Sequence, residues 1–227
     1  MRVIIMAAGR GTRLAPLTDH TPKPLVSVAG RGTLLRTLDM LPAEVTSIVL
    51  IVGHLQEKIR QAVGEQWQGK PVIYVEQTEL NGTGGALLTA KNYVQKKTLI
   101  LNGDDLYSPL DLQLMLQHDL AILAVRRSTP VKEPMVVEDG AWKGFGQPQN
   151  LPTPHYLNCG AYVLDDRYFS VDMKGFDNRG AIEYGLPHTF AQLAERGEKI
   201  MVVEATFWLP VGTHEELQAA EAVLTKV

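Results

Sequence analysis

The chain has 227 residues, of which 45% are hydrophobic and 21% are charged, and its formal net charge at pH 7 is −3. This length and composition are typical of a soluble protein with one large α/β domain rather than two small ones. Because basic residues are not in excess, nucleic acid is not an expected partner. The single cysteine, Cys159, leaves no internal disulfide and is typical of a reducing cytosol. No stretch approaches the roughly 20 apolar residues that cross a membrane, so we expect a cytoplasmic protein without a membrane partner.

The N-terminal segment predicts a phosphate-binding site. The apolar run 3–6 is short and rich in β-branched residues, which indicates a buried strand. The following loop contains Gly9 and Gly11, where the backbone N–H groups can approach an anion closely. Arg13 and, ten residues later, Lys23 can neutralise phosphate charge beside that loop. The loop is not a Walker A motif, because Gly11 is followed by a Thr-Arg pair instead of Lys-Ser/Thr.

Strand-like apolar runs alternate with helix-like segments along the chain. We expect strands over 47–52, 71–75, 98–101, 121–125, 156–164 and 199–203, and helices over 55–63, from 82 onward, 189–196 and 214–224. The Pro- and Gly-rich segment 129–157 predicts loops and short strands. This order indicates an α/β fold: a Rossmann-like, mixed and mainly parallel sheet with helices on both faces. Because ligands bind at the carboxyl ends of such strands, Asp104 and Asp105 should lie near the glycine loop.

The string A-A-G-R-G-T-R-L-A-P-L-T-D-H-T-P-K-P-L, residues 7–25, resembles the signature of sugar-1-phosphate nucleotidyltransferases. These enzymes join a nucleoside triphosphate to a sugar 1-phosphate and release pyrophosphate, so the resemblance implies those two substrates and a GT-A-like nucleotidyltransferase fold. The length resembles that of compact members such as N-acetylmuramate 1-phosphate uridylyltransferases. We therefore expect one domain over 1–227, with a nucleotide-binding half (1–128), a sugar-phosphate-binding half (129–227) and no C-terminal β-helix. A monomer or small homo-oligomer is expected.

The resemblance also implies how the reaction is catalysed. The attacking phosphate oxygen is already an anion, so rate enhancement must come from alignment and from neutralising charge. By resemblance, Arg13 binds the pyrophosphate leaving group and Lys23 binds the phosphates near the α-phosphorus; the alternative for each is a solvated surface charge. The cofactor expected is Mg²⁺, with Asp104 in L-N-G-D-D as its ligand. Asp105 is an auxiliary at most, which could instead cap the next helix or contact a hydroxyl.

A second element resembles the base-binding segment of the family. Glu76-Gln77, followed by N-G-T-G-G-A-L from Asn81, matches its Q-x(n)-G-T-x-x-A-L pattern, although the same glycines could only form a turn. Gln77 can offer a donor and an acceptor to a pyrimidine edge, which favours UTP or dTTP. The nucleotide-binding residues that we expect are Ala7, Ala8, Gly9, Gly11, Thr12, Arg13, Lys23, Gln77, Gly82 and Thr83.

The sugar side is carried by shorter matches. Asn158 and Gly160 in L-N-C-G-A-Y resemble the family's N-x-G strand, and Glu183 in R-G-A-I-E-Y stands where many members keep an acidic residue near the sugar. We expect these three residues to bind the sugar phosphate. Asn158 could equally be a buried, hydrogen-bonded strand residue, and Glu183 a charge on a helix surface.

Three departures from the family pattern fall on the metal and acceptor side. Pro210 in W-L-P-V-G-T stands where many members have the second metal-binding aspartate. The family's E-K-P element is reduced to Gly146-Gln147-Pro148, and Pro134 replaces a glycine. Two alternatives therefore stay open: a non-catalytic regulatory protein that binds nucleotides or nucleotide sugars, and a cytidylyltransferase acting on a phospho-alcohol such as phosphocholine.

Overall fold

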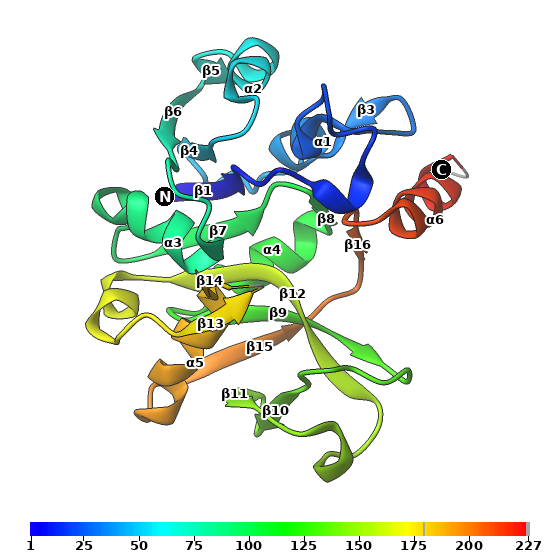
Figure 1. Ribbon diagram of the computed structural model, residues 1–227. Helices are drawn as coiled ribbons and strands as arrows, with labels where there is room; N and C mark the ends of the chain where they lie inside the picture. Colours follow the sequence, from blue (N-terminus) through cyan, green and yellow to red (C-terminus); the bar gives the residue numbers. More distant parts are fainter. Residues whose placement is uncertain (179, 226–227) are drawn as a thin grey trace.

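The centre of the molecule is a sheet of ten strands, seen in a computed structural model that describes residues 1–178 and 180–225 (Figure 1). The last two residues of the expected domain thus lie outside the described residues. In spatial order the strands are β10 (Met135–Glu138), β11 (Ala141–Phe145), β15 (Ile200–Glu204), β9 (Ala121–Arg127), β12 (His155–Leu164), β7 (Thr98–Asn102), β1 (Arg2–Ala7), β4 (Ser47–Val52), β6 (Lys70–Glu76) and β5 (Gln66–Trp67).

Most strands of this sheet run in one direction. Strand β1 pairs in parallel with β4 and β7, β4 with β6, and β9 with β15. Strand β12 lies between β7 and β9 and is antiparallel to both, so those two strands share the direction of β1. The prediction of a mixed, mainly parallel sheet is therefore confirmed. The segment 129–157 contributes β10 and β11, short strands that extend the sheet at one edge.

Both faces of the sheet are covered by helices, as predicted. In β1, residues Val3 and Ile5 belong to one core cluster and Ile4 and Met6 to the other, which explains why the run is apolar without alternation. The first cluster takes its helical residues from α1 (Thr33–Asp39), α2 (Gln56–Val63) and α4 (Pro109–Met115). The second takes them from α3 (Gly82–Thr89) and α5 (Leu186–Glu195).

The last helix, α6 (His214–Leu224), brings the C-terminal segment to the N-terminal loops. It packs in a third core cluster with Leu14, which follows the glycine loop, and with Val28 of the short hairpin β2 (Ser27–Val28) and β3 (Arg31–Gly32). Figure 1 shows α6 at the edge of the molecule, beyond β16 (Trp208–Pro210). Segments about 200 residues apart in sequence, such as Leu14 and Leu217, thus meet in one cluster.

Two of the alternatives given for single residues, a helix cap at Asp105 and a helix surface at Glu183, were wrong. Residues 105–107 form a strand, β8 (Asp105–Tyr107), which pairs with β16, and Ser108 caps the following helix by accepting a hydrogen bond from the Asp111 N–H at 3.3 Å. Asp105 therefore does not cap α4. Glu183 is not on a helix either, because it lies in the hairpin of β13 (Gly175–Asn178) and β14 (Ala181–Tyr184). The partner of β8 lies about 100 residues later in the sequence, and no regular alternation of apolar and polar residues marks β13 and β14.

No helix in the described part of the chain has the length and apolar character needed to cross a membrane.

The turn between β15 and β16 is anchored by a buried carboxylate. Asp111 of α4 has no solvent exposure, and its Oδ2 accepts hydrogen bonds from the backbone N–H groups of Thr206 at 2.7 Å and Phe207 at 3.3 Å. The Thr206 hydroxyl donates to Oδ1 at 2.8 Å. A buried carboxylate that keeps three donors in this way fixes the start of β16, which carries Trp208 and Pro210.

We therefore expect Asp111→Asn to lower the free energy of unfolding by about 2–3 kcal/mol, because a neutral amide replaces a charged acceptor for two backbone N–H groups. Urea denaturation followed by circular dichroism would measure this change. Asp119→Asn is the matched control, since Asp119 is 83% exposed and only forms a surface ion pair with Lys97. Equal stability of the two variants would contradict an anchoring role for Asp111.

Candidate functional site

The residues expected to bind a nucleotide surround one cavity. A hollow of about 550 Å³ lies at the carboxyl ends of β1, β6 and β7, the edge of the sheet where the ligand was expected. All ten predicted nucleotide-binding residues line it. Asp104 and Glu183 line it as well. Their convergence from segments up to about 180 residues apart is what the family resemblance implied.

A second cavity, of about 300 Å³, adjoins the first and shares Arg13, Asn102 and Asp104 with it. Asn158 and Gly160, two of the three predicted sugar-phosphate residues, line this smaller cavity. Glu183, the third, lines only the larger one, so the structure separates it from the pair with which it was grouped. The arrangement provides two adjoining compartments with Arg13 and Asp104 in the wall of both.

The glycine loop is shaped by close packing against the segment that carries Lys23. Gly11 has φ +66°, and a Cβ atom there would lie 2.8 Å from Cβ of Lys23 and 2.9 Å from Cγ2 of Thr18. The Thr18 hydroxyl also donates to the Gly11 carbonyl at 2.9 Å. Only glycine satisfies both the positive φ and the short approach, and this packing holds Lys23 at the wall of the cavity.

Lys23 and Asp104 form an ion pair. The Nζ atom of Lys23 donates to Oδ2 of Asp104, and the two side chains are only 14% and 22% exposed. The cation predicted to bind phosphate and the carboxylate predicted to bind metal are thus partners of each other. Arg13 is exposed and lies against Gly212, where a Cβ atom would be 3.1 Å from its Nη2 atom.

Asp105 differs sharply from its neighbour Asp104. It is 5% exposed, and burial, reinforced by the negative charge of Asp104, raises the pKa of Asp105 to about 8. Its Oδ2 lies within hydrogen-bond distance of Asn102 Nδ2 at 3.2 Å and of the Tyr107 hydroxyl at 3.4 Å. Asp105 thus contacts the hydroxyl of Tyr107, and the raised pKa favours its neutral form in the protein alone. Its role as an auxiliary metal ligand stays a prediction.

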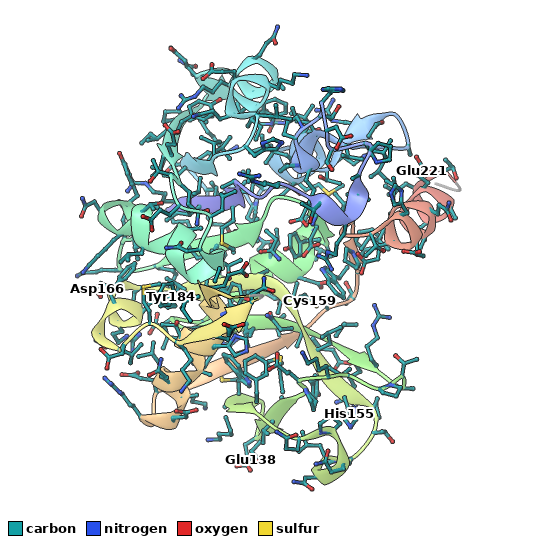
Figure 2. All side chains as sticks on the ribbon, viewed as in Figure 1. Glu138, His155, Cys159, Asp166, Tyr184 and Glu221 are labelled. Atoms are coloured by element: carbon teal, nitrogen blue, oxygen red, sulfur yellow. The ribbon has the colours of Figure 1, made fainter. Side chains whose placement is uncertain are left out.

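The segment expected to read the base is held by its own side chains. Gln77 is 5% exposed, and its Nε2 donates to Asn81 Oδ1 and to the Gly82 carbonyl, both at 3.3 Å. The donor that we expected Gln77 to offer to a base is thus used within the protein, which leaves the acceptor Oε1. Gly82 has φ +93°, and a Cβ atom there would lie 2.5 Å from the carbonyl oxygen of Tyr184, which Figure 2 labels on the hairpin beside α3.

Asn158 and Gly160 shape a bulge in β12. The Gly160 N–H donates to Asn158 Oδ1 at 2.9 Å, and Asn158 Nδ2 donates to the Tyr162 hydroxyl at 2.7 Å. Gly160 has φ +75°, and a Cβ atom there would lie 2.1 Å from Asn102 Nδ2. Asn158 is therefore a hydrogen-bonded strand residue, as the alternative stated, and it also lines the smaller cavity.

Several lining residues were not foreseen. Asn102 faces both cavities and stands beside the recognised aspartate in L-N-G-D-D, so that string could have revealed it. Glu216 lines the smaller cavity, and its Oε2 accepts from the Gly212 N–H at 2.7 Å. The sequence pattern that could have revealed Glu216 is the capping box T-x-x-E, which begins at Thr213. The Thr213 hydroxyl accepts a hydrogen bond from the Glu216 N–H at 3.2 Å. Arg10 adds a further cation to the glycine loop.

The described residues around the two cavities offer few side-chain ligands for a metal ion. Within residues 1–178 and 180–225, no group of three or more His, Cys, Asp or Glu side chains could hold one. Pro210 pairs with Asp105 across β8 and β16 and lines the smaller cavity, so the position of the second ligand is at the site but offers no side-chain oxygen. Mg²⁺ needs only one or two carboxylates when phosphates and water complete its shell, and Asp104 meets that requirement.

Residues 2–134 match the family model for nucleotidyl transferases. The chain belongs to the nucleotidyl transferase family. The bifunctional protein GlmU of Methanocaldococcus jannaschii is 31% identical over 235 residues, which cover all of this chain and 55% of that protein. The chain thus spans about half the length of the curated relatives that it matches.

Solved structures give the same fold. UDP-glucose pyrophosphorylase in complex with UDP-glucose superposes with a TM-score of 0.83 at 17% identity, covering 99% of this chain and 98% of that one. The inositol-1-phosphate CTP transferase of T. maritima gives 0.78 at 20% identity, covering 99% and 95%. The predicted family and the GT-A-like fold are confirmed. The roles of single residues, the division of the domain, the location and the oligomeric state stay predictions.

The raised pKa of Asp105 predicts a pH dependence of stability. Between the ordinary value of 3.8 and about 8, the folded protein binds more protons than the unfolded chain. The free energy of unfolding therefore falls as pH rises, by at most about 1.4 kcal/mol per pH unit. Asp105→Asn should flatten this decline between about pH 5 and 8 in urea denaturation. Asp119→Asn should keep the wild-type slope, and an unchanged slope in Asp105→Asn would contradict the raised pKa.

Proposed function

We propose that this protein transfers a nucleotidyl group from a nucleoside triphosphate to a sugar 1-phosphate, giving an NDP-sugar and pyrophosphate. The observation that carries the proposal is the convergence of the glycine loop, Lys23, Gln77 and Asp104 on one cavity, with a second cavity adjoining it at Arg13 and Asp104. The larger cavity would take the triphosphate and the smaller one the acceptor. Relatives named for nucleotide and sugar-nucleotide chemistry support this assignment.

The state of Gln77 supports UTP or dTTP as the donor substrate. With its Nε2 engaged by the 81–82 loop, the free polar atom is the acceptor Oε1. Uracil and thymine carry an N3–H donor that an amide oxygen accepts, whereas cytosine has an acceptor at N3 and would have to donate through its exocyclic amino group. Guanine carries a similar donor at N1, so this contact disfavours CTP more than GTP. Thr83 and Gly82, at the start of α3, lie in the same wall and would border the base.

The reaction asks the protein mainly to neutralise charge. A phosphomonoester carries about −2 near neutral pH, and it must approach a triphosphate that is more anionic still. Arg13 lines both cavities and can bind the pyrophosphate oxygens, while Lys23 can bind the phosphates near the α-phosphorus. Aligned by the two cavities, the acceptor oxygen attacks the α-phosphorus in line, and the phosphoanhydride bond to the pyrophosphate breaks.

Magnesium fits this scheme as a companion of the triphosphate. Asp104 and phosphate oxygens would hold Mg²⁺, which would supply positive charge to the phosphates. Lys23 is bound to Asp104 in the protein alone, so a ligand of Asp104 competes with it. Lys23 then becomes available to the substrate phosphates at the moment when they arrive.

The test is pyrophosphate release by the purified protein with Mg²⁺. UTP, dTTP, GTP, CTP and ATP would each be combined with a panel of sugar 1-phosphates and with phosphocholine. Release that requires one triphosphate together with one sugar 1-phosphate would support the proposal. Release with CTP and phosphocholine would instead support the alternative transferase, whose fold is the same. Silence across the panel would contradict the proposal.

Pro210 favours a second candidate function, that of a non-catalytic regulatory protein that binds nucleotides. It removes a carboxylate from the place where many family members hold their metal, while the nucleotide side of the larger cavity is intact. A regulatory protein of this kind would bind a triphosphate tightly, with an affinity that Mg²⁺ does not change. Isothermal titration of UTP with and without Mg²⁺, combined with the release assay, separates the two functions.

Replacing Lys23 should slow the reaction without unfolding the protein. We expect Lys23→Ala to lower kcat by about 100-fold or more, because a charge partner of the transition state is lost. Lys97→Ala is the control, since Lys97 pairs with the exposed Asp119 at 3.4 Å and lines neither cavity. Steady-state kinetics of pyrophosphate release measure both variants. Turnover near that of the wild type in Lys23→Ala would rule out the assigned role.

Restoring a carboxylate at 210 should strengthen the response to Mg²⁺. We expect Pro210→Asp to reach half-maximal activity at a several-fold lower Mg²⁺ concentration, because a second carboxylate would join Asp104 in the wall of the smaller cavity. Pro210→Ala removes the proline ring but adds no oxygen, so it should titrate as the wild type does. Superimposable Mg²⁺ titrations of all three proteins would mean that position 210 no longer faces a metal.

A further inference from the structure

We propose that Arg127 binds the phosphate of the acceptor substrate beside the smaller cavity. The inference rests on the proposed function and extends it, because it assigns a specificity-determining cation to the acceptor. Three features support it: the place of Arg127 on the sheet, the charge of the smaller cavity, and the absence of an ion pair at Arg127 among the described residues.

Arg127 ends β9 on the face of the sheet that adjoins the cavity. Residues Leu123 and Val125 of β9 belong to or pack against the first core cluster, as does Trp208, and the period of two places Arg127 on that face. The guanidinium carbon lies 5.8 Å from the centre of the Trp208 ring, and Trp208 lines the smaller cavity. A guanidinium stacked in this way still presents its N–H groups at its edge.

The charge of Arg127 also reaches the interior of the cavity. Cys159, labelled in Figure 2, lines the smaller cavity. Burial raises the pKa of Cys159, and the positive charge of Arg127 opposes that rise. The positive charge of Arg127 therefore acts on a residue that lines the smaller cavity.

Without Arg127, the lining of the smaller cavity offers little positive charge to the acceptor, which is an anion. Its lining contains three carboxyl groups, of Asp104, Asp105 and Glu216, and one cation, Arg13, while burial raises the pKa values of Cys159 and Tyr162 and so favours their neutral forms. Asp104 is paired with Lys23 and Asp105 is mostly protonated, so Glu216 is the remaining anion of this lining and Arg13, which must also serve the pyrophosphate, is its remaining cation. An incoming dianion therefore meets no net positive charge there, and a further cation nearby would favour its binding. The acceptor side therefore needs positive charge from outside this lining set.

Arg127 is free to supply that charge. Among the described residues, no carboxylate lies within 4.0 Å of its guanidinium, whereas the adjacent Arg126 pairs with Glu204 at 3.3 Å and with the Tyr156 hydroxyl. The segment Gly146-Gln147-Pro148 carries no cation and lines neither cavity. Arg127 is exposed, and its planar fork of N–H donors matches two phosphate oxygens.

The test compares Arg127→Met, Arg127→Lys and Arg126→Met in the release assay and in direct binding. Arg127→Met keeps an apolar stem against Trp208, and Arg126→Met removes the neighbouring charge on the opposite face. We expect Arg127→Met to raise KM for the acceptor by about 10- to 100-fold with KM for the triphosphate unchanged. Arg127→Lys should recover part of the loss, and Arg126→Met should leave both constants as in the wild type.

Binding is measured separately by isothermal titration of glucose 1-phosphate and of inorganic phosphate. A weaker affinity in Arg127→Met than in Arg126→Met supports the proposal even if no pair of substrates releases pyrophosphate, in which case only the proposed reaction fails. Equal affinities or equal acceptor KM values in those two variants overturn the role of Arg127 while leaving the reaction in place. Failure of the wild type to bind either phosphate also overturns it. Thermal unfolding confirms that each variant is folded.

Discussion

The ion pair of Lys23 and Asp104 is the contact on which the rest of the site depends. It joins two segments 81 residues apart, the turn after the glycine loop and the end of β7. Each group is largely buried and would be costly there alone, because a charge removed from water needs a partner. Gly11 takes part in the same constraint, since its missing Cβ is what allows the Lys23 stem to pack against the loop. A phosphate or a metal ion that binds here therefore replaces an existing partner instead of entering an uncompensated site.

The topology of the sheet explains why two cavities meet at this point. Strands β1, β6 and β7 deliver the glycine loop, Gln77 and Asp104 to one edge. Strand β12 then enters antiparallel between β7 and β9, and its bulge at Gly160 turns Asn158 toward the same edge. One reversed strand thus places the smaller cavity, in which we propose that the acceptor binds, beside the larger one. The order of strands, and not any single loop, sets the relation of the two.

Sequence patterns predicted the parts that depend on near neighbours. The buried strands could be predicted because both of their faces are apolar. The larger cavity could be predicted because ten of its lining residues, those expected to bind the nucleotide, fall in two continuous strings, 7–25 and 76–87. The strand β8 was missed because its partner, β16, follows about 100 residues later. A partner at that range leaves no local period in the sequence. The engaged amide of Gln77 and the place of Glu183 were missed for a different reason, because both depend on local contacts that no apolar period marks: Gln77 bonds residues 81 and 82, and β13 pairs with β14.

Pro210 connects the fold to the chemistry. Proline is tolerated there because β16 pairs with β8 alone among the described strands, so the missing N–H on its free side breaks no ladder. Opposite it, Asp105 is kept mostly protonated by burial. A second ionised carboxylate beside Asp104 would raise the repulsion of an acceptor phosphate, which only a firmly bound metal could offset. In the proposed reaction, a proline and a neutral acid at these two positions would lower that repulsion, and the reaction would depend more on the protein's own cations, Arg13, Lys23 and, by our inference, Arg127.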